Sequence, residues 1–64
     1  MKASELKDKS QAELAALLDS SRKEYFRLKM RHVTGQLDRV SDLVRVRKDI
    51  ARINTVIRER ELRG

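Results

Sequence analysis

The chain has 64 residues, contains neither cysteine nor proline, and is 41% charged. A chain this short buries little apolar surface, and without cysteine it cannot gain stability from disulfides or thiolate metal sites. Sixteen basic and ten acidic side chains give a formal charge of +6, which favours a polyanionic partner such as nucleic acid. We therefore expect one small domain over residues 1–64 that relies on a partner in the reducing cytoplasm.

The positive charge is concentrated in the last two thirds of the chain. Residues 1–21 carry three basic and four acidic side chains, whereas residues 22–64 carry thirteen basic and six acidic ones, a net of +7. No apolar run approaches the length of a membrane span or of a secretory signal. With one Tyr, one Phe and no Trp, the chain lacks a platform for stacking bases. Any nucleic acid should therefore be contacted through phosphates and shape.

The N-terminal third predicts one short helical turn followed by a long helix. The segment from Ser4 to Lys9 is expected to form the turn. Ser10 and Glu13 have the spacing of a capping box, in which each side chain accepts a hydrogen bond from the other residue's backbone amide. The first long helix should therefore run over about residues 10–34.

Apolar residues of this helix predict a stripe that packs against a second helix, because they recur at spacings of three and four. The stripe consists of Leu14, Leu18, Ser21, Tyr25, Leu28 and His32. A second stripe, Phe26, Met30 and Val33, lies about 100° around the helix. One neighbouring helix cannot cover both stripes, so we expect something other than the second helix to cover the second stripe.

Gly35 interrupts the helical pattern, which predicts a turn over residues 35–38 and a second helix over about 39–62. Either Asp38 or Ser41 could cap that helix. Its apolar seam has the coiled-coil period and consists of Leu43, Val46, Ile50, Ile53 and Ile57. The expected fold is all-α, a long antiparallel two-helix hairpin with arms of about 36 Å and only marginal stability in isolation.

Basic side chains of the second helix point away from its seam. A helical projection places Arg45, Lys48, Arg52 and Thr55 on the outer face, Arg47 and Arg58 on one flank, and Arg60 on the other. Lys23, Arg27 and Arg31 form a similar outer row on the first helix, with no acid within the row. Arginine suits phosphate binding because its planar fork can donate two hydrogen bonds at once. An ordinary solvated helix exterior remains the alternative.

Residues for catalysis or metal binding are lacking. His32 is the one histidine, and it has neither cysteine nor a carboxylate at helical spacing. A hairpin also offers no deep pocket that could shift a pKa. We therefore expect no enzyme activity, no cofactor, no metal and no small-molecule substrate. Glu24, Asp49 and Glu59 are interpreted as solubilising or salt-bridging groups.

Two segments resemble a known family. One runs from Glu24 to Met30 and continues into the turn from Thr34 to Leu37; the other runs from Val46 to Glu59. Both are similar to segments of ribosomal protein family twenty-nine of the large subunit, and the resemblance covers nearly the whole chain. It implies a helical hairpin on large-subunit ribosomal RNA near the polypeptide exit tunnel, beside ribosomal protein twenty-three and close to docking places for nascent-chain factors.

The resemblance also suggests which residues contact RNA. Positions carried over from the family's motifs are Gly35, Gln36, Arg47, Lys48, Arg52, Thr55 and Arg58. Arg27, Arg31 and Arg45 are added from the projection alone. Each neutralised phosphate would release condensed counterions, so the affinity should fall steeply with salt.

Two rival functions make different predictions. A protein-interaction hairpin without RNA binding would associate through its apolar stripes, insensitively to salt. A helix lying on an anionic membrane would normally carry aromatic anchors, which this chain lacks.

Overall fold

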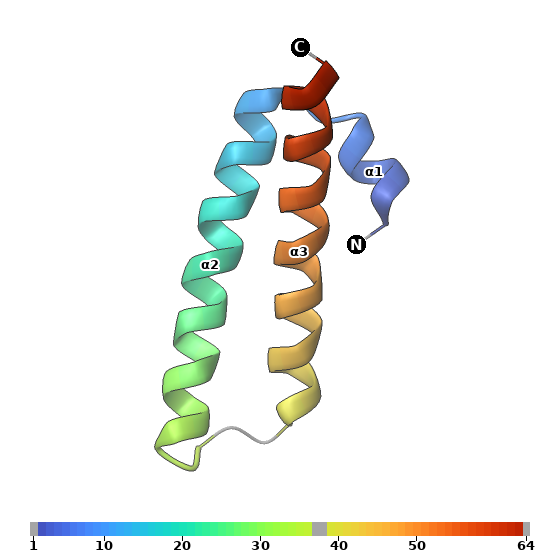
Figure 1. Ribbon diagram of the computed structural model, residues 1–64. Coiled ribbons are helices and arrows are strands. Elements are labelled where there is room, and N and C mark those ends of the chain that lie inside the picture. Colours follow the sequence, from blue (N-terminus) through green and yellow to red (C-terminus); the bar gives the residue numbers. More distant parts are fainter. Residues whose placement is uncertain (1, 37–38, 64) are drawn as a thin grey trace.

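The computed structural model describes residues 2–36 and 39–63 and contains three helices in that part of the chain (Figure 1). They are α1 (Ala3–Lys7), α2 (Gln11–Val33) and α3 (Val40–Arg63). The long helices α2 and α3 lie side by side and run antiparallel, which gives a rod with Cα extents of 44 × 17 × 16 Å. The predicted all-α hairpin with a short N-terminal helix is confirmed. Leu37 and Asp38 of the predicted turn lie outside the described residues.

The start of α2 is set by the side chains of Ser10, which precedes the helix, and Glu13. The Ser10 hydroxyl oxygen accepts a hydrogen bond from the Glu13 amide at 3.1 Å, and Glu13 Oε1 accepts one from the Ser10 amide at 3.4 Å. Both bonds use amides that the first turn of a helix leaves without an intrahelical partner. The predicted capping box is therefore confirmed, and the helix begins at Gln11.

The end of α2 depends on Gly35. Its φ of 76° lies in the left-handed region, which glycine adopts without the steric cost that a Cβ imposes. The Gly35 amide donates to the His32 carbonyl at 3.1 Å, and the Gln36 amide donates to the Arg31 carbonyl at 2.8 Å. These two bonds form a Schellman motif, which satisfies the last carbonyls of the helix. The predicted break at Gly35 is confirmed.

The start of α3 corrects one predicted alternative. Ser41 is the second residue of this helix and therefore does not cap it, because the backbone is already helical at Val40. Asp38, the other candidate cap, is not among the described residues.

The core lies where all three helices meet. Leu6 of α1, Leu14 of α2, and Ile53 and Val56 of α3 form one buried cluster. The side chains packed against the cluster are Leu17, Leu18 and Ile57. Sequence reasoning named neither Leu6 nor Val56 as core residues. In Figure 1, α1 lies along the C-terminal half of α3. A prediction based on two helices alone did not include this third packing element.

The packing of α1 against α3 shifts the buried stripe of α3 from its predicted position. The most buried residues are Val46, Asp49, Ile53 and Val56, so the stripe is rotated by roughly 60° from the one predicted around Ile50. Among the predicted packing positions, Leu14, Ser21, Leu28, Val46 and Ile53 are buried, whereas His32 is exposed because it lies at the loop end of the hairpin, beyond the core. The half-buried ones are Leu18, Tyr25, Leu43, Ile50 and Ile57.

The second stripe of α2 remains uncovered in the isolated chain. Phe26 is 66% exposed, Met30 48% and Val33 71%. At the loop end of α3, Val40 and Val44 are also exposed. The hairpin therefore presents large apolar side chains outside its core.

Candidate nucleic-acid interface

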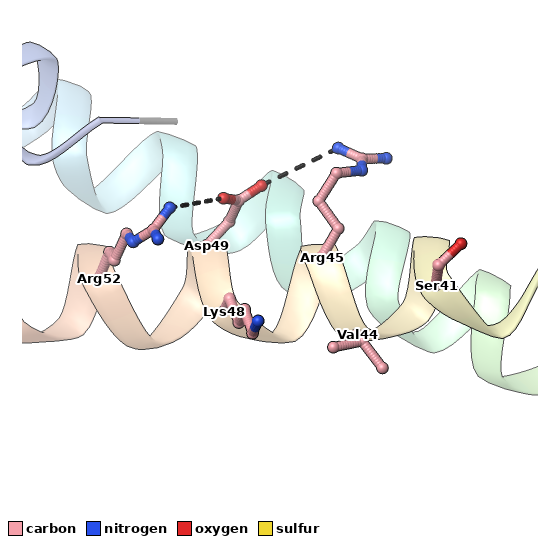
Figure 2. A pocket seen from close by; sticks show the side chains of 6 residues that line it. All are labelled: Ser41, Val44, Arg45, Lys48, Asp49 and Arg52. Carbon is pink, nitrogen blue, oxygen red and sulfur yellow. Dashed lines mark ion pairs between the residues drawn. The ribbon is translucent and has the colours of Figure 1, made fainter.

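The outer face of α3 carries a shallow hollow rimmed by cations (Figure 2). Its lining residues are Ser41, Val44, Arg45, Lys48, Asp49 and Arg52. A second hollow lies between α1 and α3 and is lined by Ala3, Lys7, Ala51, Arg52, Thr55, Val56 and Glu59. Arg52 borders both hollows, so they follow one another along α3. We call Arg45, Lys48, Arg52 and Thr55 the outer face.

Asp49 lies between two arginines of this face. Its Oδ2 is 4.0 Å from Arg45 Nη1, and its Oδ1 is 4.0 Å from Arg52 Nη1. The Asp49 side chain is only 12% exposed, whereas those of Arg45 and Arg52 are 62% and 52% exposed. The interpretation of Asp49 as a salt-bridging group agrees with these ion pairs, but its burial was not foreseen.

Thr55 uses its hydroxyl proton within the helix. Its Oγ1 donates to the Ala51 carbonyl at 2.8 Å, which is the local back-bonding typical of threonine in helices. The hydroxyl oxygen keeps its acceptor capacity. Thr55 can therefore accept from a ribose 2′-hydroxyl, but in this arrangement it does not donate to a phosphate.

The predicted contact residues at the hairpin tip form a separate group. Arg31 Nη2 donates to the Gln36 carbonyl at 3.3 Å, across the Schellman turn that contains Gly35. This bond brings Arg31, Gly35 and Gln36 together. All ten predicted contact residues are exposed, including Arg27 on α2 and Arg47 and Arg58 on the flank of α3. Exposure permits contact with RNA without demonstrating it, so the assignment remains a prediction.

Two basic residues differ from their sequence interpretation. Arg60, placed on a phosphate-binding flank, is half-buried and donates through Nη2 to the carbonyls of Leu6 at 3.4 Å and Lys7 at 2.8 Å. It therefore fastens α1 to α3. Lys23, assigned to a row without acids, pairs with Asp19 at 3.1 Å. That exposed i,i+4 pair contributes little to stability.

The described residues form neither a cluster of metal ligands nor a membrane-spanning helix. Across residues 2–36 and 39–63, no three histidine, cysteine or acidic side chains gather as metal ligands would. None of the three described helices is both long and apolar enough to span a membrane. The outer face of α3 and the hairpin tip bring together the residues predicted to contact RNA.

Comparison with known proteins identifies the family. The sequence model of the ribosomal L29 proteins matches residues 4–60, which is most of the chain. The chain belongs to the ribosomal L29 protein family. This membership confirms the resemblance seen in the turn and in the second helix.

Several L29 relatives are similar over almost their full length. A large ribosomal subunit protein uL29 from Carboxydothermus hydrogenoformans is 52% identical over 62 residues, which cover 97% of this chain and 90% of the relative. Proteins of the same name from Natranaerobius thermophilus and Acetivibrio thermocellus are 47% and 48% identical, covering 95% and 96% of those relatives and 97% and 100% of this chain. This chain therefore spans nearly the whole length of these relatives.

Proposed function

We propose that this chain is a structural, non-catalytic component of the large ribosomal subunit and binds large-subunit ribosomal RNA through the outer face and flank of α3. The observation that carries the proposal is the row of exposed cations on α3 in a member of the L29 family. The names of the relatives place those proteins in the large subunit. No cofactor or small-molecule substrate is needed for such a role.

Binding would be mainly electrostatic. Arg45, Lys48 and Arg52 surround one hollow on α3, while Arg47 and Arg58 extend the positive surface along its flank. The guanidinium groups can each bond two phosphate oxygens, and neutralised phosphates release counterions. With few aromatic rings available, the shape and phosphate spacing of folded RNA would guide docking more than base identity.

The shape of the molecule supports a need for a partner. A rod 44 Å long and 17 Å wide has a small core for its surface, and Phe26, Met30 and Val33 stay exposed in the isolated chain. Within this proposal, RNA sugar edges or a neighbouring protein cover that stripe. Ribosomal protein twenty-three is the neighbour that the family resemblance suggests, at the rim of the polypeptide exit tunnel where nascent-chain factors also dock.

The proposal is tested by removing charges that support no ion pair in the described structure. Arg47, Lys48 and Arg58 would be changed together to glutamine, and affinity for deproteinised large-subunit RNA measured across a salt series. The matched control changes Lys2, Arg22 and Arg39, which lowers the net charge equally. We expect the first variant to bind about tenfold more weakly, with a salt slope shallower by about two.

Equal affinity and slope for the two triple variants would reject α3 as the RNA-binding face. Association of the RNA-free protein with itself or with another protein, unchanged by salt, would instead favour the protein-interaction hairpin. Co-sedimentation with large subunits after a moderate salt wash tests membership of the subunit directly.

A further inference from the structure

A carboxylate lies between two arginines of α3, at the border of the outer face with the buried stripe, where its charge opposes the binding of phosphate. Asp49 is one of only two polar residues buried in the described structure, at 8% exposure. Its charge lowers the local sum over Arg45, Lys48 and Arg52 from +3 to +2. A group that weakens the attraction for a polyanion requires a compensating role at this position.

The geometry indicates what that role is. Arg45 precedes Asp49 by four residues and Arg52 follows it by three, so the carboxylate contacts one guanidinium on each side (Figure 2). The two arginines are seven residues apart, which is about 10.5 Å along a helix. At 4.0 Å, both contacts are ion pairs beyond hydrogen-bond length. The carboxylate therefore attracts both groups while they stay more than half exposed.

Arg47 and Arg58 provide a comparison within the same helix. Both are exposed, and among the described residues neither forms an ion pair with a carboxylate. Binding must therefore order both side chains. Each long side chain that a complex immobilises costs about 0.5 to 1.5 kcal/mol of binding free energy. The ion pairs of Arg45 and Arg52 with Asp49 favour ordered side chains before any ligand arrives.

We propose that Asp49 is a positioning residue that holds Arg45 and Arg52 at a fixed separation and thereby makes α3 selective for folded RNA over flexible polyanions. This inference rests on the proposed function. A rigid RNA with phosphates at the matching separation gains from the preset arginines. A flexible polyanion adapts to any arrangement, so it gains nothing from them and still meets the negative charge of Asp49.

The selectivity is tested by comparing two ligands, deproteinised large-subunit RNA and heparin, at one salt concentration. Asp49→Asn should bind the RNA about fivefold more weakly, since two arginines lose their preset positions. Its affinity for heparin should not fall, because one negative charge is gone. In an Arg45→Gln, Arg52→Gln background, the same Asp49→Asn change should leave the ratio of the two affinities unaltered.

Other results would distinguish a failure of the proposed role of Asp49 from a failure of the proposed function. An equal loss for both ligands, or unchanged affinity for both, would overturn the role of Asp49 while leaving RNA binding by the wild-type chain intact. A wild-type chain that does not bind the RNA would instead overturn the proposed function. Asp49→Glu keeps the charge and should therefore be more selective for RNA over heparin than Asp49→Asn. Equal selectivity of the two variants would count against a positioning role for Asp49.

A measurement on the wild-type chain avoids dependence on the folding of any Asp49 variant. Nitrogen relaxation of the arginine Nε groups reports the order of each guanidinium in the free protein. Arg45 and Arg52 should be more ordered than Arg47 and Arg58. Equal order in the four side chains would overturn the proposal.

Discussion

Arg60 and Lys7 are 53 residues apart in sequence, and the guanidinium Nη2 of Arg60 donates to the Lys7 carbonyl at 2.8 Å. The same nitrogen donates to the Leu6 carbonyl at 3.4 Å. The Leu6 carbonyl also accepts from the Lys9 amide at 3.2 Å, so Arg60 adds a second donor there, and its cation opposes the negative end of the helix dipole. With five residues, α1 is too short to be stable alone, so it depends on Arg60 and on burial of Leu6.

Replacement of Leu6 by alanine should destabilise the chain by about 3 kcal/mol, because this side chain of α1 is fully buried in one cluster with Leu14 and Ile53. The free energy of unfolding can be followed by circular dichroism in urea, with TMAO added to populate the folded state. Leu62→Ala is the control, since Leu62 is 81% exposed and should change stability by less than about 0.5 kcal/mol. Similar effects of the two changes would contradict the packing of α1 on α3.

Replacement of Arg60 by glutamine should loosen α1 without reducing RNA affinity as strongly as Arg58→Gln does. The Leu6 amide, which donates to the Lys2 carbonyl, should exchange its hydrogen roughly fivefold faster, equivalent to a loss of about 1 kcal/mol. Hydrogen exchange measured by NMR checks this expectation. If Arg60→Gln leaves exchange unchanged but weakens RNA binding as much as Arg58→Gln, Arg60 is an RNA ligand after all.

Replacement of Gly35 by alanine should cost about 1 kcal/mol, because a Cβ is unfavourable at a φ of 76°. The space around an added Cβ is open, with no atom within 4 Å, so the cost comes from the backbone alone. Gly35→Asn is the matched control and should cost less, since asparagine tolerates the left-handed region better. Thermal unfolding of the three proteins would show the order glycine, asparagine, alanine. Equal midpoints for glycine and alanine would contradict the turn geometry.

Replacement of Ser10 by alanine should destabilise α2 by about 1 kcal/mol through loss of the bond to the Glu13 amide. Ser10→Asp should retain most of the stability, because a carboxylate can also cap the helix. Ser20→Ala serves as the control, since the Ser20 hydroxyl merely donates to the Leu17 carbonyl on an exposed part of α2. Urea titration distinguishes them; a loss at Ser20 as large as that at Ser10 would argue against a specific cap.

Local signals in the sequence were sufficient to predict the two long helices and the break at Gly35. The Ser10 and Glu13 spacing, the left-handed preference of Gly35 and the three-four periodicity act within a few residues, so they can be interpreted without knowing the tertiary structure. The same periodicity predicted a basic face on α3, and Arg45, Lys48 and Arg52 are exposed in the structure, although the buried stripe lies closer to them than predicted. Their contact with RNA is still a prediction.

Tertiary contacts decided where α1 lies and which flank of α3 is buried. The Leu6 side chain meets Ile53 and Val56, almost fifty residues away, and no local pattern encodes that pairing. An apolar stripe also fits a partner over a range of rotations, so the projection centred on Ile50 missed Val56 and the burial of Asp49. Arg60 and Arg58 are alike as basic residues of one helix, and only the position of α1 makes the first a structural anchor and leaves the second exposed.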